Sequence, residues 1–329
     1  MPSHKEKYSE LCAREPGIPL FLRDWWLDAT CRNQWDVALI EKSGDIVGVF
    51  PYYAKKIFWI NTLVMPKLTP FLGIWLKYPE GQKYATKLSH EKSVTTELID
   101  SLPHHDYFYQ KLHYSITNWL PFYWKNFKQT TEYTYVIENL SDLDHVFSEF
   151  RDNIRREIRK AEKQVTVTCD TSLERIYEIT QMTFKRQNMK LPFSFECIKK
   201  IDAACQKKEC RKIFVAEDAE GKVHAAIYIV WDNHSAYYLF GGGDPEARTS
   251  GAMSLLMWEA IKFAATVSQK FDFEGSIIEP VERFFRSFGA TQKPFFKITK
   301  SNSIIVKTAL SFLGEIGLRR ITRACQLLK

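Results

Sequence analysis

The sequence predicts an α/β (α+β) protein of two domains, each built on a mixed sheet flanked by helices. The chain has 329 residues, 45% hydrophobic and 26% charged, which is enough for two globular domains of ordinary size. A strand–turn–strand pattern near residue 36 returns near residue 213. Between residues 236 and 299, short apolar strands alternate with helical segments, as expected for a mixed sheet with helical connections.

The two hairpin patterns are the evidence for a duplicated domain. Residues 35–53 and 213–231 each contain two strand-like runs, and Gly44 and Gly221 occupy the same place in the two turns. A pattern that recurs after half of the chain favours an internal repeat. We therefore expect an N-terminal domain over residues 1–138, a C-terminal domain over residues 139–300 and a basic amphipathic tail over residues 301–329.

The rest of the first half reads as buried structure. Residues 57–76 are apolar, but two prolines, an asparagine and a lysine interrupt them, so we expect strands and turns rather than a membrane span. Residues 94–128 are rich in aromatic side chains and are expected to close the first domain with a helix and a strand. A strand over residues 132–138 then leads into the second domain.

The second half begins with helices. Ser141 is the expected N-cap, with Asp144 three residues later. Apolar residues from Val146 to Ala161 follow at helical spacing, which fits either one helix or two short ones. A strand at 165–168 and helices at 173–187 and 195–207 are expected next.

A junction between a strand and a helix is the main candidate for a ligand site. A strand over residues 236–240 ends in glycines, and after a loop a helix begins at Gly251. Glycines let a ligand approach the backbone, and a helix N-terminus offers free N–H groups to a phosphate or an oxyanion. The alternative is a bulge or turn without a ligand. The candidate donor-binding residues are Gly241, Gly242, Gly243, Arg248, Gly251 and Ala252.

The chain continues with a strand at 271–275, a short helix at 282–288 closed by Gly289, and a strand at 295–299. The eight histidines show no triad or metal-ligand spacing, so no metal site is expected.

Charge and cysteine usage suggest a cytoplasmic protein with one basic segment. Seven lysines and arginines but only one acidic residue, Glu315, follow Phe295, so most of the net charge of +7 lies there. The seven cysteines are scattered and form no CxxC pair, which favours reduced thiols. The polar N-terminal residues do not resemble a signal peptide.

Several motifs resemble those of known acyltransferase families. The order of elements after residue 213 resembles the GNAT fold, and Arg248–Met253 resembles its Arg/Gln-x-x-Gly-x-Gly/Ala phosphate loop, with Met253 in the last small position. Three segments resemble the Fem-type peptidyltransferases, with moderate specificity over residues 141–300 and only a loose match before residue 141. They are Ile154–Lys163, Phe271–Ser276 and Arg283–Gly289, the last with Phe285 where that family usually has lysine.

The resemblance implies a tandem GNAT-like N-acyltransferase fold with a degenerate first domain. Fem-type enzymes transfer an aminoacyl group from charged tRNA to an amine of a peptidoglycan precursor, whereas GNAT-like relatives use acyl-CoA. The expected activity is therefore transfer from an acyl-CoA or aminoacyl-tRNA to a small-molecule or lipid-linked amine. This chemistry needs proximity, an oxyanion donor and a proton acceptor, and no tightly bound cofactor.

Four residues are candidates for the catalytic groups. Asp272 and Glu274 lie two residues apart on a predicted strand, and we expect one of them to face the groove. Glu279 lies in the predicted loop after that strand, and Tyr238 lies on the strand before the glycines. Each of the four is also accounted for by an ordinary structural role.

Four arginines are candidates for substrate binding: Arg155, Arg159, Arg186 and Arg286. Arg155 and Arg159 share a helix face, which suits a phosphate, a tRNA or a lipid-linked diphosphate. The alternative is a solvated face paired with the neighbouring acidic residues. Arg186 is equally explained as a helix cap.

A different class of function fits the same features. Phe285 and Met253 favour a catalytically silent binding protein that docks on a membrane or nucleic acid. The tail, with an apolar stripe beside Arg319, Arg320 and Arg323, fits a packed helix, an anionic membrane surface or tRNA phosphates. A membrane role would place the protein at the inner face of the cytoplasmic membrane.

Overall fold

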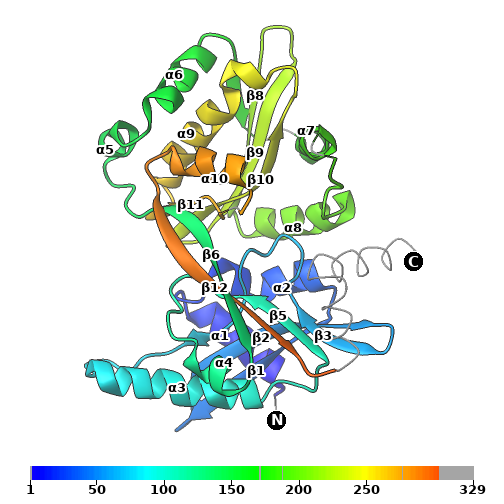
Figure 1. The fold of residues 1–329 in the computed structure, drawn as a ribbon, viewed down its shortest axis with the longest axis vertical. Coiled ribbons are helices and arrows are strands. Elements are labelled where there is room, and N and C mark those ends of the chain that lie inside the picture. The colour runs from blue at the N-terminus through cyan, green and yellow to red at the C-terminus, as the bar shows by residue number, and fades with distance from the viewer. Residues whose placement is uncertain (1, 170–171, 187, 276, 304–329) are drawn as a thin grey trace. The chain divides into compact units, whose positions relative to one another are not determined.

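The computed structural model describes residues 2–169, 172–186, 188–275 and 277–303, which cluster into two compact units. The first unit contains the chain up to Glu132 and the segment from Phe295, and the second contains Tyr133–Pro294. Figure 1 shows the elements of both. The predicted tail lies almost wholly outside the described residues, and the predicted division after residues 138 and 300 stays a prediction.

The first unit is a sheet with helices packed around an aromatic core. Its strands follow the order β1–β2–β3–β5–β12, and β4 pairs with β2. Phe50, Phe108 and Phe122 are fully buried in its core. Its elements are α1 (His4–Arg14), η1 (Leu20–Leu22), α2 (Asp24–Cys31), β1 (Trp35–Lys42), β2 (Asp45–Ile57), β3 (Ile60–Val64), β4 (Trp75–Leu76), α3 (Tyr84–Asp100), β5 (Tyr107–Lys111), α4 (Leu120–Trp124) and the end of β12 (Thr291–Ser301).

The second unit is a six-stranded mixed sheet in the order β6–β11–β10–β9–β8–β7. The strands β10 and β11 are parallel, and the other described pairs are antiparallel. Its elements are β6 (Lys128–Ile137), α5 (Leu143–Ser148), α6 (Asp152–Ala161), β7 (Thr166–Cys169), α7 (Leu173–Arg186), α8 (Phe195–Lys207), β8 (Arg211–Glu217), β9 (Val223–Trp231), β10 (Ser235–Gly243), η2 (Arg248–Ser250), α9 (Ala252–Ala264), β11 (Lys270–Asp272) and α10 (Glu279–Arg286).

Side chains that alternate along β9 face two different layers. Ile227 and Ile229 join the apolar core formed with α5, α6, α9 and α10. Tyr228, between them, donates a hydrogen bond to Asp202 of α8 at 2.9 Å. The sheet is therefore covered on both faces, and α9 and α7 lie on opposite sides of it in Figure 1.

The structure confirms a mixed sheet flanked by helices and both predicted hairpins, which are β1–β2 and β8–β9. It resolves the predicted helical stretch after residue 141 into two helices, α5 and α6. The predicted N-cap was wrong: Asp142, not Ser141, caps α5, because its carboxylate accepts the N–H of His145.

Candidate active site

The two parallel strands of the second unit separate after three paired positions. β10 and β11 pair from Ser235–Lys270 to Tyr237–Asp272, where β11 ends. β10 continues to Gly243, paired with β9 on its other side. Among the described residues, the edge of β10 beyond Tyr237 has no strand partner. Its backbone N–H and C=O groups can therefore hydrogen-bond an extended ligand.

A β-bulge lies at the start of this open edge. The register between β10 and β9 shifts between Tyr238 and Phe240, so Leu239 is the additional residue. A bulge bends its strand and re-aims the neighbouring side chains. It therefore helps β10 to diverge from β11 at this point.

Tyr238 is the candidate catalytic residue that lies along the open edge. Its half-buried ring contacts Phe285, with 5.9 Å between the ring centroids. Its hydroxyl lies 3.0 Å from where a Cβ on Gly241 would be, so it points along β10 toward that glycine. Burial raises the pKa of Tyr238. The hydroxyl is therefore neutral at physiological pH and can donate a proton or a hydrogen bond.

Asp272 lies at the base of the separation and is 2% exposed. Its Oδ1 accepts the Thr134 hydroxyl at 2.5 Å and the Glu274 N–H at 2.8 Å. Burial raises the pKa of Asp272 to about 6, although these two hydrogen bonds oppose the increase. The carboxylate is thus ionised at neutral pH and anchors the turn that follows β11.

The other two carboxylate candidates lie outside the elements predicted for them. Because β11 ends at Asp272, Glu274 is in a turn, with φ of 61°, and not on a strand. Glu279 is the first residue of α10 rather than part of a loop. Its side chain is 80% exposed and pairs with Arg283 at 3.1 Å, which is an ordinary contact on a helix surface.

The N-terminus of α9 is covered by α6. Gly251, the N-cap, has φ of 80°, and a Cβ there would lie 2.4 Å from the carbonyl oxygen of Glu157. The Glu157 carboxylate accepts the hydroxyl of Ser254 at 2.5 Å, and Lys160 donates to the Thr249 carbonyl at 2.6 Å. A carboxylate of the protein itself therefore lies beside the helix turn whose partial positive charge favours anions. No local pattern predicts this contact, because it joins residues about a hundred positions apart.

The glycines at the end of β10 are explained largely by packing. A Cβ on Gly242 would lie 2.6 Å from the Ile179 carbonyl oxygen of α7. The Gly243 N–H donates to the Thr183 hydroxyl at 2.9 Å. Gly242 is therefore required by the close approach of a helix, whereas Gly241 lies beside the Tyr238 hydroxyl.

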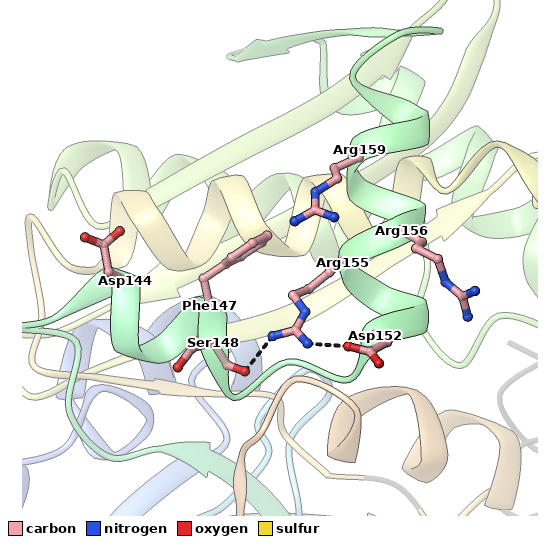
Figure 2. A pocket seen from close by; sticks show the side chains of 7 residues that line it. All are labelled: Asp144, Phe147, Ser148, Asp152, Arg155, Arg156 and Arg159. Atoms are coloured by element: carbon pink, nitrogen blue, oxygen red, sulfur yellow. Dashed lines mark hydrogen bonds and ion pairs between the residues drawn. The ribbon is translucent and has the colours of Figure 1, made fainter.

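Three arginines of α6 line a surface hollow of about 540 Å³ together with Asp144, Phe147, Ser148 and Asp152. Figure 2 shows Arg155 and Arg159 extending toward Phe147, with Arg156 directed away from them. Arg155 donates to the Ser148 carbonyl at 2.7 Å and pairs with Asp152. Among the described side chains, Arg159 has no ion-pair partner and is exposed. The hollow therefore presents guanidinium groups that fit a phosphate-bearing ligand.

The remaining predicted cations are dispersed. Arg186 is the last residue of α7 and Arg248 the first of η2, and both are exposed. Arg286 donates to Glu282 at 2.8 Å, and the same carboxylate oxygen accepts the Tyr135 hydroxyl at 2.5 Å. Arg286 is therefore engaged in a network that the sequence did not predict.

Phe285 is part of the core. It is 5% exposed, and its ring packs against Phe273, with 5.4 Å between the centroids, as well as against Tyr238. The place where Fem-type proteins usually have lysine therefore holds a buried apolar ring. Arg286 does not supply a cation there, because its guanidinium is bound to Glu282.

Comparison with known proteins finds a match within the second unit. Residues 148–276 match the family model of the acetyltransferase (GNAT) domain. Together with the similar solved structures described next, this match confirms the resemblance to Fem-type and GNAT-like acyltransferases. No curated protein matches the sequence at a significant level.

Three solved structures are similar to nearly the whole chain. FemX has a TM-score of 0.65 at 12% identity and covers 90% of this chain and 96% of its own. The C-terminal domain of a putative lysylphosphatidylglycerol synthetase from Agrobacterium fabrum has a TM-score of 0.53 at 11% identity, with coverages of 94% and 95%. A tandem GNAT protein from the clavulanic acid biosynthesis pathway has a TM-score of 0.51 at 9% identity, with coverages of 90% and 93%.

At these identities the likeness establishes the fold, including its tandem GNAT form, and the GNAT match supports an acyltransferase. In the described ranges, no three His, Cys, Asp or Glu side chains are grouped closely enough to hold a metal ion. Within the same ranges, no helix is both long and apolar enough to cross a bilayer.

Proposed function

We propose that the second unit is an N-acyltransferase that moves an aminoacyl group from charged tRNA to an amine. The observation that carries the proposal is the open edge of β10, with Tyr238 along it and Asp272 at its base. An extended acyl donor would bind this edge through backbone hydrogen bonds. The reacting carbonyl would then lie near Tyr238.

The chemistry requires one bond to form and one to break. The amine nitrogen attacks the ester carbonyl carbon, a C–N bond forms, and the C–O bond to the leaving oxygen breaks. Backbone N–H groups of the open edge stabilise the oxyanion. Tyr238 protonates the leaving oxygen, and the attacking amine loses its proton to water, so that one proton passes overall from amine to leaving group.

Two features favour aminoacyl-tRNA over acyl-CoA as donor. The first is Glu157, because a carboxylate beside the N-terminus of α9 opposes binding of a diphosphate there. The second is the hollow lined by Arg155, Arg156 and Arg159, which suits the backbone of a polyanion. The Fem-type resemblance points to the same donor.

We further propose that the acceptor is a lipid-linked or other cell-envelope amine reached from the cytoplasmic side. The similarity to FemX and to a putative lysylphosphatidylglycerol synthetase supports this class of acceptor. In this proposal residues 1–138 form a degenerate GNAT-like domain, and residues 139–300 carry the activity.

The proposal is tested with bulk tRNA charged with labelled amino acids and, separately, with acetyl-CoA. We expect the protein to bind charged tRNA and, with an extract of envelope precursors, to transfer the label. Tyr238→Phe keeps the ring against Phe285 and should lower turnover without weakening donor binding. Binding and turnover with acetyl-CoA alone would refute the donor, and turnover unaffected by Tyr238→Phe would refute the catalytic role.

Buried Phe285 favours a second candidate, a binding protein without catalysis. The chain has the acyltransferase fold, but position 285 holds phenylalanine where Fem-type proteins usually have a lysine. The same assay separates the two candidates. A silent binding protein would retain charged tRNA on a filter and release none of the label to any amine.

A further inference from the structure

The hairpin between β2 and β3 extends beyond the rest of its sheet. Pairing of β2 with β1 ends at Tyr53, and pairing of β3 with β5 involves only Thr62 and Leu63. The pairs Lys55–Thr62, Lys56–Asn61 and Ile57–Ile60 complete the hairpin. The hairpin end, residues 55–62, is thus two-stranded beyond its base at Thr62, and it is visible to the right of β3 in Figure 1. We call it the finger.

The tip of the finger exposes two large aromatic side chains. Phe58 is 64% exposed and Trp59 is 69% exposed, and their ring centroids are 5.8 Å apart. Phe58 also has φ of 54°, a conformation that a bulky residue adopts at a cost of about 1–3 kcal/mol and that Asn or Gly adopts readily. Neither ring contributes to the core, so folding alone gives no reason to keep phenylalanine and tryptophan at this turn.

The sequence on both sides of these rings carries charge of one sign. Lys55 and Lys56 directly precede the tip, and residues 46–79 contain four lysines and no acidic residue. Asp106 lies nearby, but its carboxylate accepts the N–H of Asn61 at 2.8 Å at the base of the finger. Exposed rings and a local excess of cations fit a surface with an apolar interior beneath an anionic outer layer.

The last described residues of the chain lie beside the base of the finger. The Asp106 N–H donates to the Asn61 carbonyl at 2.8 Å, and the Asn302 N–H donates to the Asp106 carbonyl at 2.9 Å. The chain therefore reaches residue 302 beside the base of the finger. The tail sequence that follows, outside the described residues, carries Arg319, Arg320 and Arg323.

We propose that the finger docks the protein on an anionic phospholipid bilayer, with Phe58 and Trp59 in the interfacial layer and Lys55 and Lys56 on the headgroups. Indole and phenyl rings favour the membrane–water interface, and each lysine near an anionic surface adds to binding. Two rings on a narrow hairpin end offer too little area for a stable protein interface. The proposal goes beyond the proposed function and does not depend on which donor is used.

The test is co-sedimentation of the full-length chain with vesicles of phosphatidylcholine alone or mixed with phosphatidylglycerol. Phe58→Ser/Trp59→Ser should lower the partition coefficient on mixed vesicles about tenfold. The matched control is Tyr123→Ser/Trp124→Ser on α4, where the exposed fractions are 59% and 54%, and it should bind as the wild type does. Lys55→Gln/Lys56→Gln should weaken binding about fivefold per lysine, only on anionic vesicles.

Unchanged vesicle binding of the Phe58/Trp59 variant would overturn the proposal. An equal loss of binding in the α4 control, or a wild type that does not bind anionic vesicles, would overturn it as well. Arg319→Gln/Arg320→Gln/Arg323→Gln separates the tail from the finger. If this variant loses all binding while the Phe58/Trp59 variant retains it, the tail alone docks the protein. Thermal unfolding of each variant, followed by circular dichroism, verifies that the fold is intact.

Discussion

Replacing Gly251 with alanine should destabilise the second unit without acting on a ligand at all. The residue has φ of 80°, and a Cβ would lie 2.4 Å from the Glu157 carbonyl oxygen, which is backbone and cannot rotate away. A non-glycine residue in the left-handed region costs about 1–2 kcal/mol. Displacing α6 from the start of α9 adds about 1–3 kcal/mol of overpacking. We expect a total loss of about 2–5 kcal/mol in the free energy of unfolding.

Gly221→Ala is the matched control, because Gly221 has φ of 77° but no atom within 4 Å of the added Cβ. It should cost only the conformational part, about 1–2 kcal/mol. Urea unfolding followed by circular dichroism measures both variants. Equal losses would refute the reasoning, since they would mean that α6 gives way without cost.

Three further outcomes are expected. Asp272→Asn should remove a pH dependence of the free energy of unfolding. Burial raises the pKa of the Asp272 carboxyl to about 6, so between about pH 4 and 6 the folded state retains a proton that the unfolded state has lost. The free energy of unfolding of the wild type therefore falls by about 3 kcal/mol as the pH rises through this range. Urea titrations at pH 4 and pH 7 should show that fall only in the wild type. Arg159→Ala should lower the salt slope of tRNA binding by about 1 with no loss of stability, whereas Arg14→Ala on α1 should not. Phe285→Lys should cost about 2 kcal/mol or more in urea unfolding, because it places a charge among Phe273 and Tyr238.

Local patterns predicted the elements of the fold well. The alternation of apolar residues around Gly44 and Gly221 indicated both hairpins, and helical spacing indicated α7, α8 and α9. The ends of elements were less predictable. The segment 271–275 was predicted to be one strand that includes Glu274. In the structure β11 stops at Asp272, whose side chain accepts the Glu274 N–H and starts a turn. A hydrogen bond between a side chain and the backbone determines where the strand ends, and the periodicity of apolar residues does not predict such a bond.

The site was predicted only in part, because it depends on contacts between distant segments. The sequence pointed to the strand–helix junction, which stays a prediction, and to Arg155 and Arg159, which line one hollow. It did not indicate that Glu157 reaches Ser254, or that Tyr135 and Arg286 share the carboxylate of Glu282. The buried position of Phe285 follows from ring packing with Phe273, which no local spacing defines.

Packing accounts for two of the glycines that the sequence analysis proposed as donor-binding residues. Gly242 and Gly251 allow two helices to approach closely, α7 against β10 and α6 against α9. That packing covers the helix N-terminus, whereas the edge of β10 beyond Tyr237 has no partner strand among the described residues. A donor that needs the helix N-terminus would have to displace Glu157, whereas one that binds the strand edge would not. The informative substitutions are therefore those of side chains along the edge and the hollow, Tyr238 and Arg159, because changes at the glycines alter the scaffold itself.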